Sequence, residues 1–299
     1  MPSSTAAPSS NDPQVLRVAA GGAEAELLLL RPPSGPARQL LYWLPAMGVA
    51  ARNYLPLAAA LAGHGLAVAL HEWRGIGSSS WRAGRRRDWG YRELLQEDLP
   101  AGLAAARAAL PEAQALIGGH SLGGQLSALY AGLHPAAFDG LVLVASGAPY
   151  WCCFRHRWAV RAAYGLAPLL AGLCGHLPGR RIGFGGNEAR GVIRDWSRSG
   201  RSGRYAAAGL GELESGMARL DCPLLALRLR DDWLGPDASL EWLLGKLPRA
   251  TPTRVVLTTA ELHGPADHFS WMKAPAAVAA CIAAWAVARG AAIGAAAAS

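Results

Sequence analysis

The chain has 299 residues, a net charge of +8, and 52% apolar against 17% charged residues. This balance excludes a long disordered polypeptide and favours a folded globule large enough to bury a core. The charge favours anionic surroundings, but no helix-turn-helix or aromatic-interleaved basic pattern accompanies it, so we expect no nucleic-acid partner. The five cysteines form no C-x-x-C pair, so we expect neither a disulfide framework nor a metal site, no cofactor and a cytoplasmic protein.

Short apolar runs alternate with helix-forming stretches along much of the chain. Strands are predicted at 15–18 and 25–30, as a hairpin, and then at 39–44, 66–70, 115–118, 140–145, 224–229 and 254–258. Helices are predicted at 54–62, 91–110, 123–133 and 238–247. Strands that alternate with helices imply right-handed crossovers, so the fold class is α/β with a mostly parallel central sheet flanked by helices.

The alternation stops over residues 149–220, where helical pieces, glycines and scattered arginines replace it. We interpret this stretch as a helical cap inserted over the carboxyl ends of the strands, where open α/β sheets bind ligands. Residues 15–148 and 221–290 would then be the two parts of the core domain. Residues 1–14 are expected to form a disordered tail, and residues 291–299 a second tail.

Neither end of the chain predicts a membrane segment. The first 14 residues are rich in Ser, Pro and Ala and lack the basic and apolar regions of a signal peptide. The apolar stretch 274–298 is dominated by alanine and contains Arg289, so we predict a final amphipathic helix rather than a transmembrane span.

A strand, a tight turn and a helix meet at Gly119-His120-Ser121-Leu122-Gly123. This segment matches the G-x-S-x-G nucleophile elbow, in which a strained backbone exposes the Ser Oγ above the sheet. The alternative is a glycine-rich turn with a capping serine. We predict Ser121 as a catalytic nucleophile.

A serine hydroxyl needs a base that takes its proton and an acid that orients the base. On this architecture the acid and the histidine follow the serine, each after a strand. Asp231 and Asp232 follow one of the last strands; we prefer Asp232, which stands four residues before the turn residue Pro236, and keep Asp231 as the alternative. His268 precedes the final helix and is the preferred base, while His263 stays possible.

The remaining site residues follow from the same architecture. The backbone N–H groups of Met47 and Leu122 are the expected oxyanion-hole donors. Tyr150 and Trp151 at the start of the cap are candidates for an apolar acyl-binding slot, although aromatic residues there also serve to pack a cap on its body.

With these residues placed, the chain resembles the α/β-hydrolase superfamily from about residue 15 to residue 290. Within it, the chain is similar to a bacterial group of predicted hydrolases related to monoacylglycerol lipases and serine-aminopeptidase-like hydrolases. The segments that carry this narrower likeness are Pro45-Ala46-Met47-Gly48, Trp73-Arg74-Gly75-Ile76-Gly77-Ser78 and the elbow at 119–123. The resemblance implies Ser121, Asp232 and His268 as the triad. Relatives carry His-Gly where this chain has Pro45-Ala46, so the support of the oxyanion loop must differ.

The sequence thus predicts a metal-free serine hydrolase that cleaves a carboxylic ester, thioester or amide through an acyl-enzyme, with a small apolar or anionic acyl ester as substrate. One alternative is an acyltransferase that uses the same acyl-enzyme. Another is a non-catalytic homologue that binds a ligand or partner. A separate hypothesis is that the arginine-rich run 81–87 docks on anionic head groups or lipid surfaces; a solvated loop is the preferred interpretation.

Overall fold

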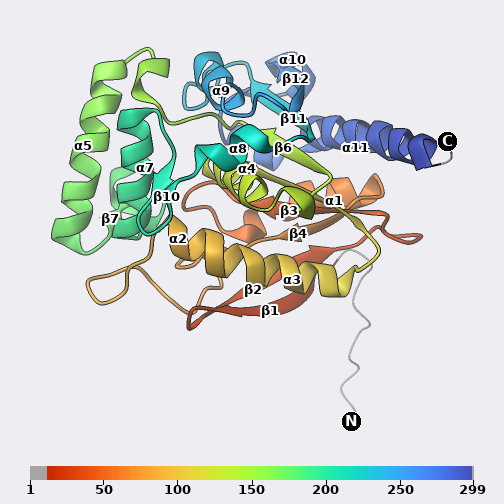
Figure 1. The fold of residues 1–299 in the computed structure, drawn as a ribbon, viewed down its shortest axis with the longest axis horizontal. Helices are drawn as coiled ribbons and strands as arrows, with labels where there is room; N and C mark the ends of the chain where they lie inside the picture. The colour runs from red at the N-terminus through yellow and green to blue at the C-terminus, as the bar shows by residue number, and fades with distance from the viewer. Residues whose placement is uncertain (1–11, 298–299) are drawn as a thin grey trace, which may run out of the picture.

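The computed structural model describes residues 12–297, with side chains described through residue 289. Across the described residues an eight-stranded sheet runs in the order β1-β2-β4-β3-β5-β6-β11-β12 (Figure 1). Its strands are β1 (Gln14–Ala20), β2 (Ala23–Leu30), β3 (Gln39–Leu44), β4 (Ala67–Leu70), β5 (Gln114–His120), β6 (Gly140–Val144), β11 (Pro223–Leu229) and β12 (Thr251–Leu257). β2 pairs antiparallel with β1 and with β4, and the other neighbouring pairs are parallel. The predicted α/β fold with a mostly parallel sheet is confirmed.

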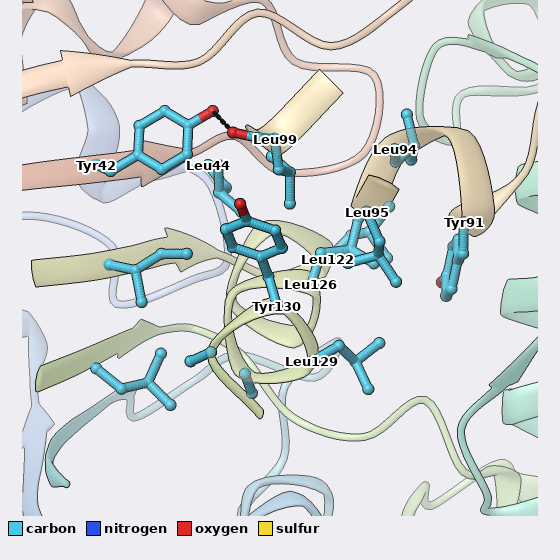
Figure 2. Close-up of a cluster of buried hydrophobic side chains, with 14 of the residues drawn as sticks. Tyr42, Leu44, Tyr91, Leu94, Leu95, Leu99, Leu122, Leu126, Leu129 and Tyr130 are labelled. Atoms are coloured by element: carbon cyan, nitrogen blue, oxygen red, sulfur yellow. Dashed lines mark hydrogen bonds between the residues drawn. The ribbon is translucent and has the colours of Figure 1, made fainter. Parts of the chain in front are cut away.

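Helices cover both faces of the sheet, so its inner strands are apolar on both sides. The helices of the body are α1 (Leu55–Gly63), α3 (Leu99–Ala109), α4 (Leu122–Leu133), α9 (Asp237–Leu244), α10 (Thr259–Leu262) and α11 (Ala276–Ala297). Tyr42 and Leu44 of β3 point to the core under α3 and α4, which Figure 2 shows with Leu126 and Leu129 around them. Trp43 points to the opposite core, under α1 and α11.

The helix predicted over residues 91–110 has an irregular first half. α2 (Tyr91–Glu93) continues into a π-helical turn (Leu94–Asp98) before α3 begins. Pro100 near the start of α3 has no N–H to donate, so a regular helix through this point would lose a hydrogen bond. The wider turn also presents Asp98 to Arg74, whose Nε lies 3.1 Å from the carboxylate, and both side chains are buried.

The chain between β6 and β11 forms the helical insertion. Its helices are α5 (Arg157–Cys174), α6 (Gly179–Ile182), α7 (Arg190–Ser202) and α8 (Glu214–Arg219), and its short ribbons pair β7 (Leu177–Pro178) with β8 (Asn187–Glu188) and β9 (Ala206–Ala207) with β10 (Gly211–Glu212). In Figure 1, α5 is the outermost helix and α7 lies between it and the body. The boundaries of the cap at 149 and 220 stay a prediction.

The ends of the chain are only partly described. Residues 1–11 of the predicted first tail and residues 298–299 of the second lie outside the described residues. β1 already begins at Gln14, and α11 continues to Ala297 through most of the stretch expected as a tail. Among the described helices, none combines the length and the apolar character needed to cross a membrane.

Candidate active site

Ser121 lies in the sharp turn between β5 and α4, with φ 55° and ψ −119°. A positive φ is strained for a residue with a side chain, and its neighbours explain how the turn is held. A Cβ on Gly119 would lie 2.5 Å from the carbonyl carbon of Gly123, and one on Gly123 would collide with the Leu44 carbonyl oxygen. The Ser121 N–H also donates to the Val144 carbonyl oxygen at 3.1 Å. The local geometry is that of a nucleophile elbow.

A second feature of the site is a buried pair formed by Asp232 and His268. His268 Nδ1 lies 2.7 Å from Asp232 Oδ2, and the two residues are 5% and 3% exposed. The other carboxylate oxygen accepts the N–H groups of Leu234 and Gly235, both at 2.9 Å. Because an ionised carboxylate only accepts hydrogen bonds, the proton of the pair belongs on Nδ1, which leaves Nε2 of His268 free to take another.

The structure separates the preferred residues from their alternatives. Asp231, next to Asp232, is exposed, and its backbone N–H donates to the Ala266 carbonyl oxygen. His263 is exposed at the end of α10, where φ is 51°. Of these four side chains, the structure brings together Asp232 and His268.

The imidazole of His268 lies beside the elbow. Its ring centroid is 4.7 Å from that of His120, the residue that precedes Ser121. Within the described residues, no hydrogen bond joins Ser121 Oγ to the imidazole. Such bonds are often long in free enzymes and shorten in the complex with substrate, so the arrangement is compatible with proton transfer from Ser121 to His268.

The loop after β3 has its own support in place of the His-Gly of relatives. The Pro45 carbonyl oxygen accepts a hydrogen bond from Trp73 Nε1 at 2.9 Å, and the Ala46 N–H donates to Tyr54 Oη at 2.9 Å. The Ala46 N–H is therefore already hydrogen-bonded, and the next N–H along the loop belongs to Met47. No acceptor for it is found among the described residues.

Leu122 supplies the second free N–H group. It is the first residue of α4, and the first N–H groups of a helix have no partner within the helix. The partial positive charge of a helix N-terminus adds to the attraction for an anion. The N–H groups of Met47 and Leu122 are therefore available for the oxygen of a substrate.

Sequence reasoning missed a hydrogen-bonded link between the oxyanion loop and the elbow. Tyr54 Oη accepts from Ala46, so its own proton goes to His120 Nδ1, 2.9 Å away. Complete burial holds the pKa of His120 well below its usual range, so this imidazole is neutral. The two residues are 66 positions apart in the sequence, and no local pattern connects them.

A buried carboxyl group behind the oxyanion loop was also missed. Gly185 and Gly186 of the insertion lie directly against Met47 and Gly48, and a Cβ on Gly48 would collide with the Gly186 backbone. Glu188 Oε1 accepts the Gly186 N–H at 3.0 Å. Burial raises the pKa of Glu188 to about 7.

Tyr150 and Trp151, the candidates for substrate contact, have aromatic partners outside the Ser121 and His268 group. The Tyr150 ring lies 4.6 Å from that of Trp242 in α9, and Trp151 lies 4.8 Å from Trp158 in α5, centroid to centroid. The contact between Tyr150 and Trp242 packs the insertion on the body, as in the alternative given from the sequence, and the contact between Trp151 and Trp158 lies within the insertion. A role of Tyr150 and Trp151 in substrate binding stays a prediction.

Comparison with known proteins is consistent with this arrangement. Residues 35–177 match the family model described as serine aminopeptidase, S33. A membrane phospholipase A, described as a bacterial virulence factor, has a TM-score of 0.62 and 16% identity over 94% of this chain and 87% of that one. The haloalkane dehalogenase DatA from Agrobacterium tumefaciens has a TM-score of 0.67 and 14% identity over 94% of this chain and 100% of that one. A thermophilic esterase from Thermogutta terrifontis has a TM-score of 0.59 and 16% identity over 92% of this chain and 99% of that one.

No curated protein matches the chain in sequence. The fold and the family match nevertheless define its class, because both extend over the strands that carry the elbow and the oxyanion loop. The chain belongs to the α/β-hydrolase superfamily. Within that superfamily, residues 35–177 are similar to the serine aminopeptidase S33 family.

Proposed function

We propose that the chain is a serine hydrolase that cleaves carboxylic esters through an acyl-enzyme on Ser121. The observation that carries this proposal is the buried Asp232–His268 pair, at 2.7 Å, with its imidazole beside the strained elbow. Attack of Ser121 Oγ on the ester carbonyl forms the new C–O bond while His268 Nε2 takes the hydroxyl proton. The buried Asp232 carboxylate stabilises the imidazolium that results.

The oxygen that becomes negative in this step needs donors that are already in place. The N–H groups of Met47 and Leu122 fulfil that role, and removal of one such donor costs about 10²–10³ in turnover. Collapse of the tetrahedral intermediate breaks the ester C–O bond, and the imidazolium returns its proton to the leaving alcohol. Water then attacks the acyl-enzyme with the same general base, which releases the acid and regenerates Ser121.

Two observations favour an ester over the amino-terminal peptide that the family's name suggests. Residues 140–187, which include α5, contain no Asp or Glu, and the carboxyl group of Glu188 beside the oxyanion loop is buried and accepts the Gly186 N–H, so neither offers an exposed carboxylate to a substrate ammonium group. Several structures of similar fold are described as esterases, among them Est1E from Butyrivibrio proteoclasticus, which has ferulic acid bound. We therefore place the chain's substrate among carboxylic esters with an apolar acyl or aromatic part.

The first test is the substitution Ser121→Ala. The wild-type protein should react with a fluorophosphonate probe and hydrolyse p-nitrophenyl esters, and the variant should do neither. Ser202→Ala, an exposed serine in α7, is the matched control and should behave as wild type. Persistent labelling of the Ser121 variant would remove this residue from the mechanism, and transfer of the acyl group to added alcohols would favour an acyltransferase.

A further inference from the structure

Helix α5 has two apolar faces, and the described part of the chain covers only one of them. Tyr164 and Ala171 on the inner face are 3% and 0% exposed, and Gly200 of α7 lies directly against the Tyr164 ring. The other face carries four large apolar side chains that are 64%, 65%, 65% and 74% exposed: Trp158, Leu166, Leu169 and Leu173. Their spacing places them in one stripe along the helix. A surface helix ordinarily turns polar residues to water, so a stripe of this kind marks an interaction site.

The chain segment that carries this stripe is basic. No Asp or Glu occurs between residues 140 and 187. The same stretch contains five arginines: Arg155, Arg157, Arg161, Arg180 and Arg181. A large apolar stripe with a rim of one charge sign is typical of helices that lie in the interface of an anionic membrane.

A basic pocket lies just beyond the C-terminal end of the stripe. His176, Arg180, Arg181 and Asn187 line it, together with Cys174. The arginine-rich loop 81–87 adjoins this end of α5, because Arg85 donates to the Leu173 carbonyl oxygen at 2.7 Å. Guanidinium groups are suited to the planar, bidentate recognition of phosphate oxygens.

This basic segment is continuous in the chain with residues that lie against the oxyanion loop. Arg180 and Arg181 lie in α6, and the chain then continues to Gly185 and Gly186, which lie against Gly48 of the oxyanion loop. A surface that bound here would therefore adjoin the segment that lies against the oxyanion loop.

We propose that the docking face, defined as the exposed stripe of α5 together with the basic pocket and Arg85, binds an anionic phospholipid bilayer. The leucines would enter the boundary of the acyl chains, and the arginines would contact lipid phosphates. Charge complementarity selects this occupant. A second copy of the chain would bring one basic face against another. An acidic soluble protein would pair with the arginines of the rim, but its charge would not account for the apolar stripe.

The docking face also narrows the class of ester substrates. This second inference rests on the proposed function. An ester hydrolase held at a bilayer by a segment that adjoins its oxyanion loop is positioned to take esters dissolved in that bilayer. We therefore assign a membrane-partitioned lipid ester as the substrate class.

Sedimentation with vesicles tests the docking face directly. The purified full chain is mixed with vesicles of phosphatidylcholine alone and with vesicles that also contain phosphatidylglycerol, at low and high salt. We expect binding to the anionic vesicles that weakens as salt rises. The double variant Arg180→Glu, Arg181→Glu should weaken it about thirtyfold, and Leu169→Gln, Leu173→Gln about tenfold.

Matched controls carry the same changes on distant elements. Val287→Gln alters a side chain that is 60% exposed on α11, and Arg17→Glu alters an exposed arginine on β1; both should bind as wild type. Circular dichroism and turnover of a water-soluble ester, equal to wild type in all variants, would show that the docking-face substitutions leave the fold and the catalytic site intact.

Absence of vesicle binding by the wild type at low salt would overturn the proposal, and so would binding that neither double variant weakens. A dimer in solution that Leu169→Gln, Leu173→Gln dissociates would assign the face to a second copy instead. Ser121→Ala should bind vesicles as wild type does. Ester turnover without vesicle binding would thus refute the docking face alone, and vesicle binding without turnover of any ester would refute the proposed function alone.

Discussion

The body and the insertion differ in whether their charged and apolar side chains are buried or exposed. In the body, two pairs of buried groups face each other: Arg74 and Asp98, whose atoms approach to 2.5 Å, and Asp232 and His268. In the insertion, the arginines around α5 and α6 are exposed, and a row of leucines faces the solvent beside them. Groups that are desolvated and paired hold a fixed geometry, which a reaction requires. Exposed side chains of one charge sign beside an apolar stripe are suited to bind another molecule. In the functions proposed above, the body carries out the reaction and the insertion binds the membrane.

The largest expected effect is the loss of kcat on substitution of Asp232, the proposed acid in the body. Asp232→Asn keeps the shape of the side chain but removes the charge that fixes the tautomer of His268, so kcat should fall about 10⁴-fold. Steady-state turnover of a p-nitrophenyl ester measures the loss. Asp231→Asn, which changes the exposed neighbour, should leave kcat as it is; the opposite result would make Asp231 the acid.

The next effect concerns Tyr54, which we expect to act as a positioning residue. Tyr54→Phe leaves the Ala46 N–H and His120 Nδ1 without their partner, so the oxyanion loop loses its tie to the elbow. We expect kcat to fall about 10²-fold with little change in KM, since the donor at Met47 matters most in the transition state.

Tyr42→Phe is the matched control for that variant. Tyr42 is also buried, but its hydroxyl bonds to His71 and the Leu99 carbonyl on the opposite face of the sheet. Urea unfolding should show that each variant loses about 1–3 kcal/mol of unfolding free energy, while only Tyr54→Phe lowers kcat. An equal loss of kcat in both would mean that the Tyr54 hydroxyl serves stability alone.

A smaller effect tests the contact between the insertion and the oxyanion loop. Burial raises the pKa of Glu188 from 4.5 to about 7, so the folded protein holds this proton more tightly than the unfolded chain does. The stability that the protonated group contributes is complete below pH 4.5 and is lost as the pH rises through 7. Between these limits Glu188→Gln should avoid a loss on the order of 3 kcal/mol in the unfolding free energy.

Urea unfolding of both proteins at several pH values measures this difference. Glu112→Gln, which changes an exposed carboxyl group, should follow the wild-type pH profile. Parallel profiles for wild type and Glu188→Gln would show that the ionisation of Glu188 is not linked to folding.

Much of the body could be predicted because its signals are local. Apolar runs of strand length and the glycines around Ser121 lie within short segments of the chain, and the candidate acid and histidine were each found in the segment after a predicted strand. The preference for Asp232 over Asp231 rested only on the distance to Pro236, since packing alone shows which of two adjacent carboxylates is buried against His268. The link from Tyr54 to His120 is likewise invisible in the sequence, because it joins a loop and a strand end that are 66 positions apart.

The sequence by itself determined the succession of strands and helices along the chain and the position of the sharp turn at Ser121, since backbone sterics and side-chain periodicity act over a few residues. The tertiary structure alone decided which side chains meet and which stay in water. Helix α5 makes the reason plain: its apolar residues surround the helix, and nothing in their spacing tells the covered face from the exposed one. Only the placement of α7 against one side reveals that the other side has no partner within the described chain (Figure 1).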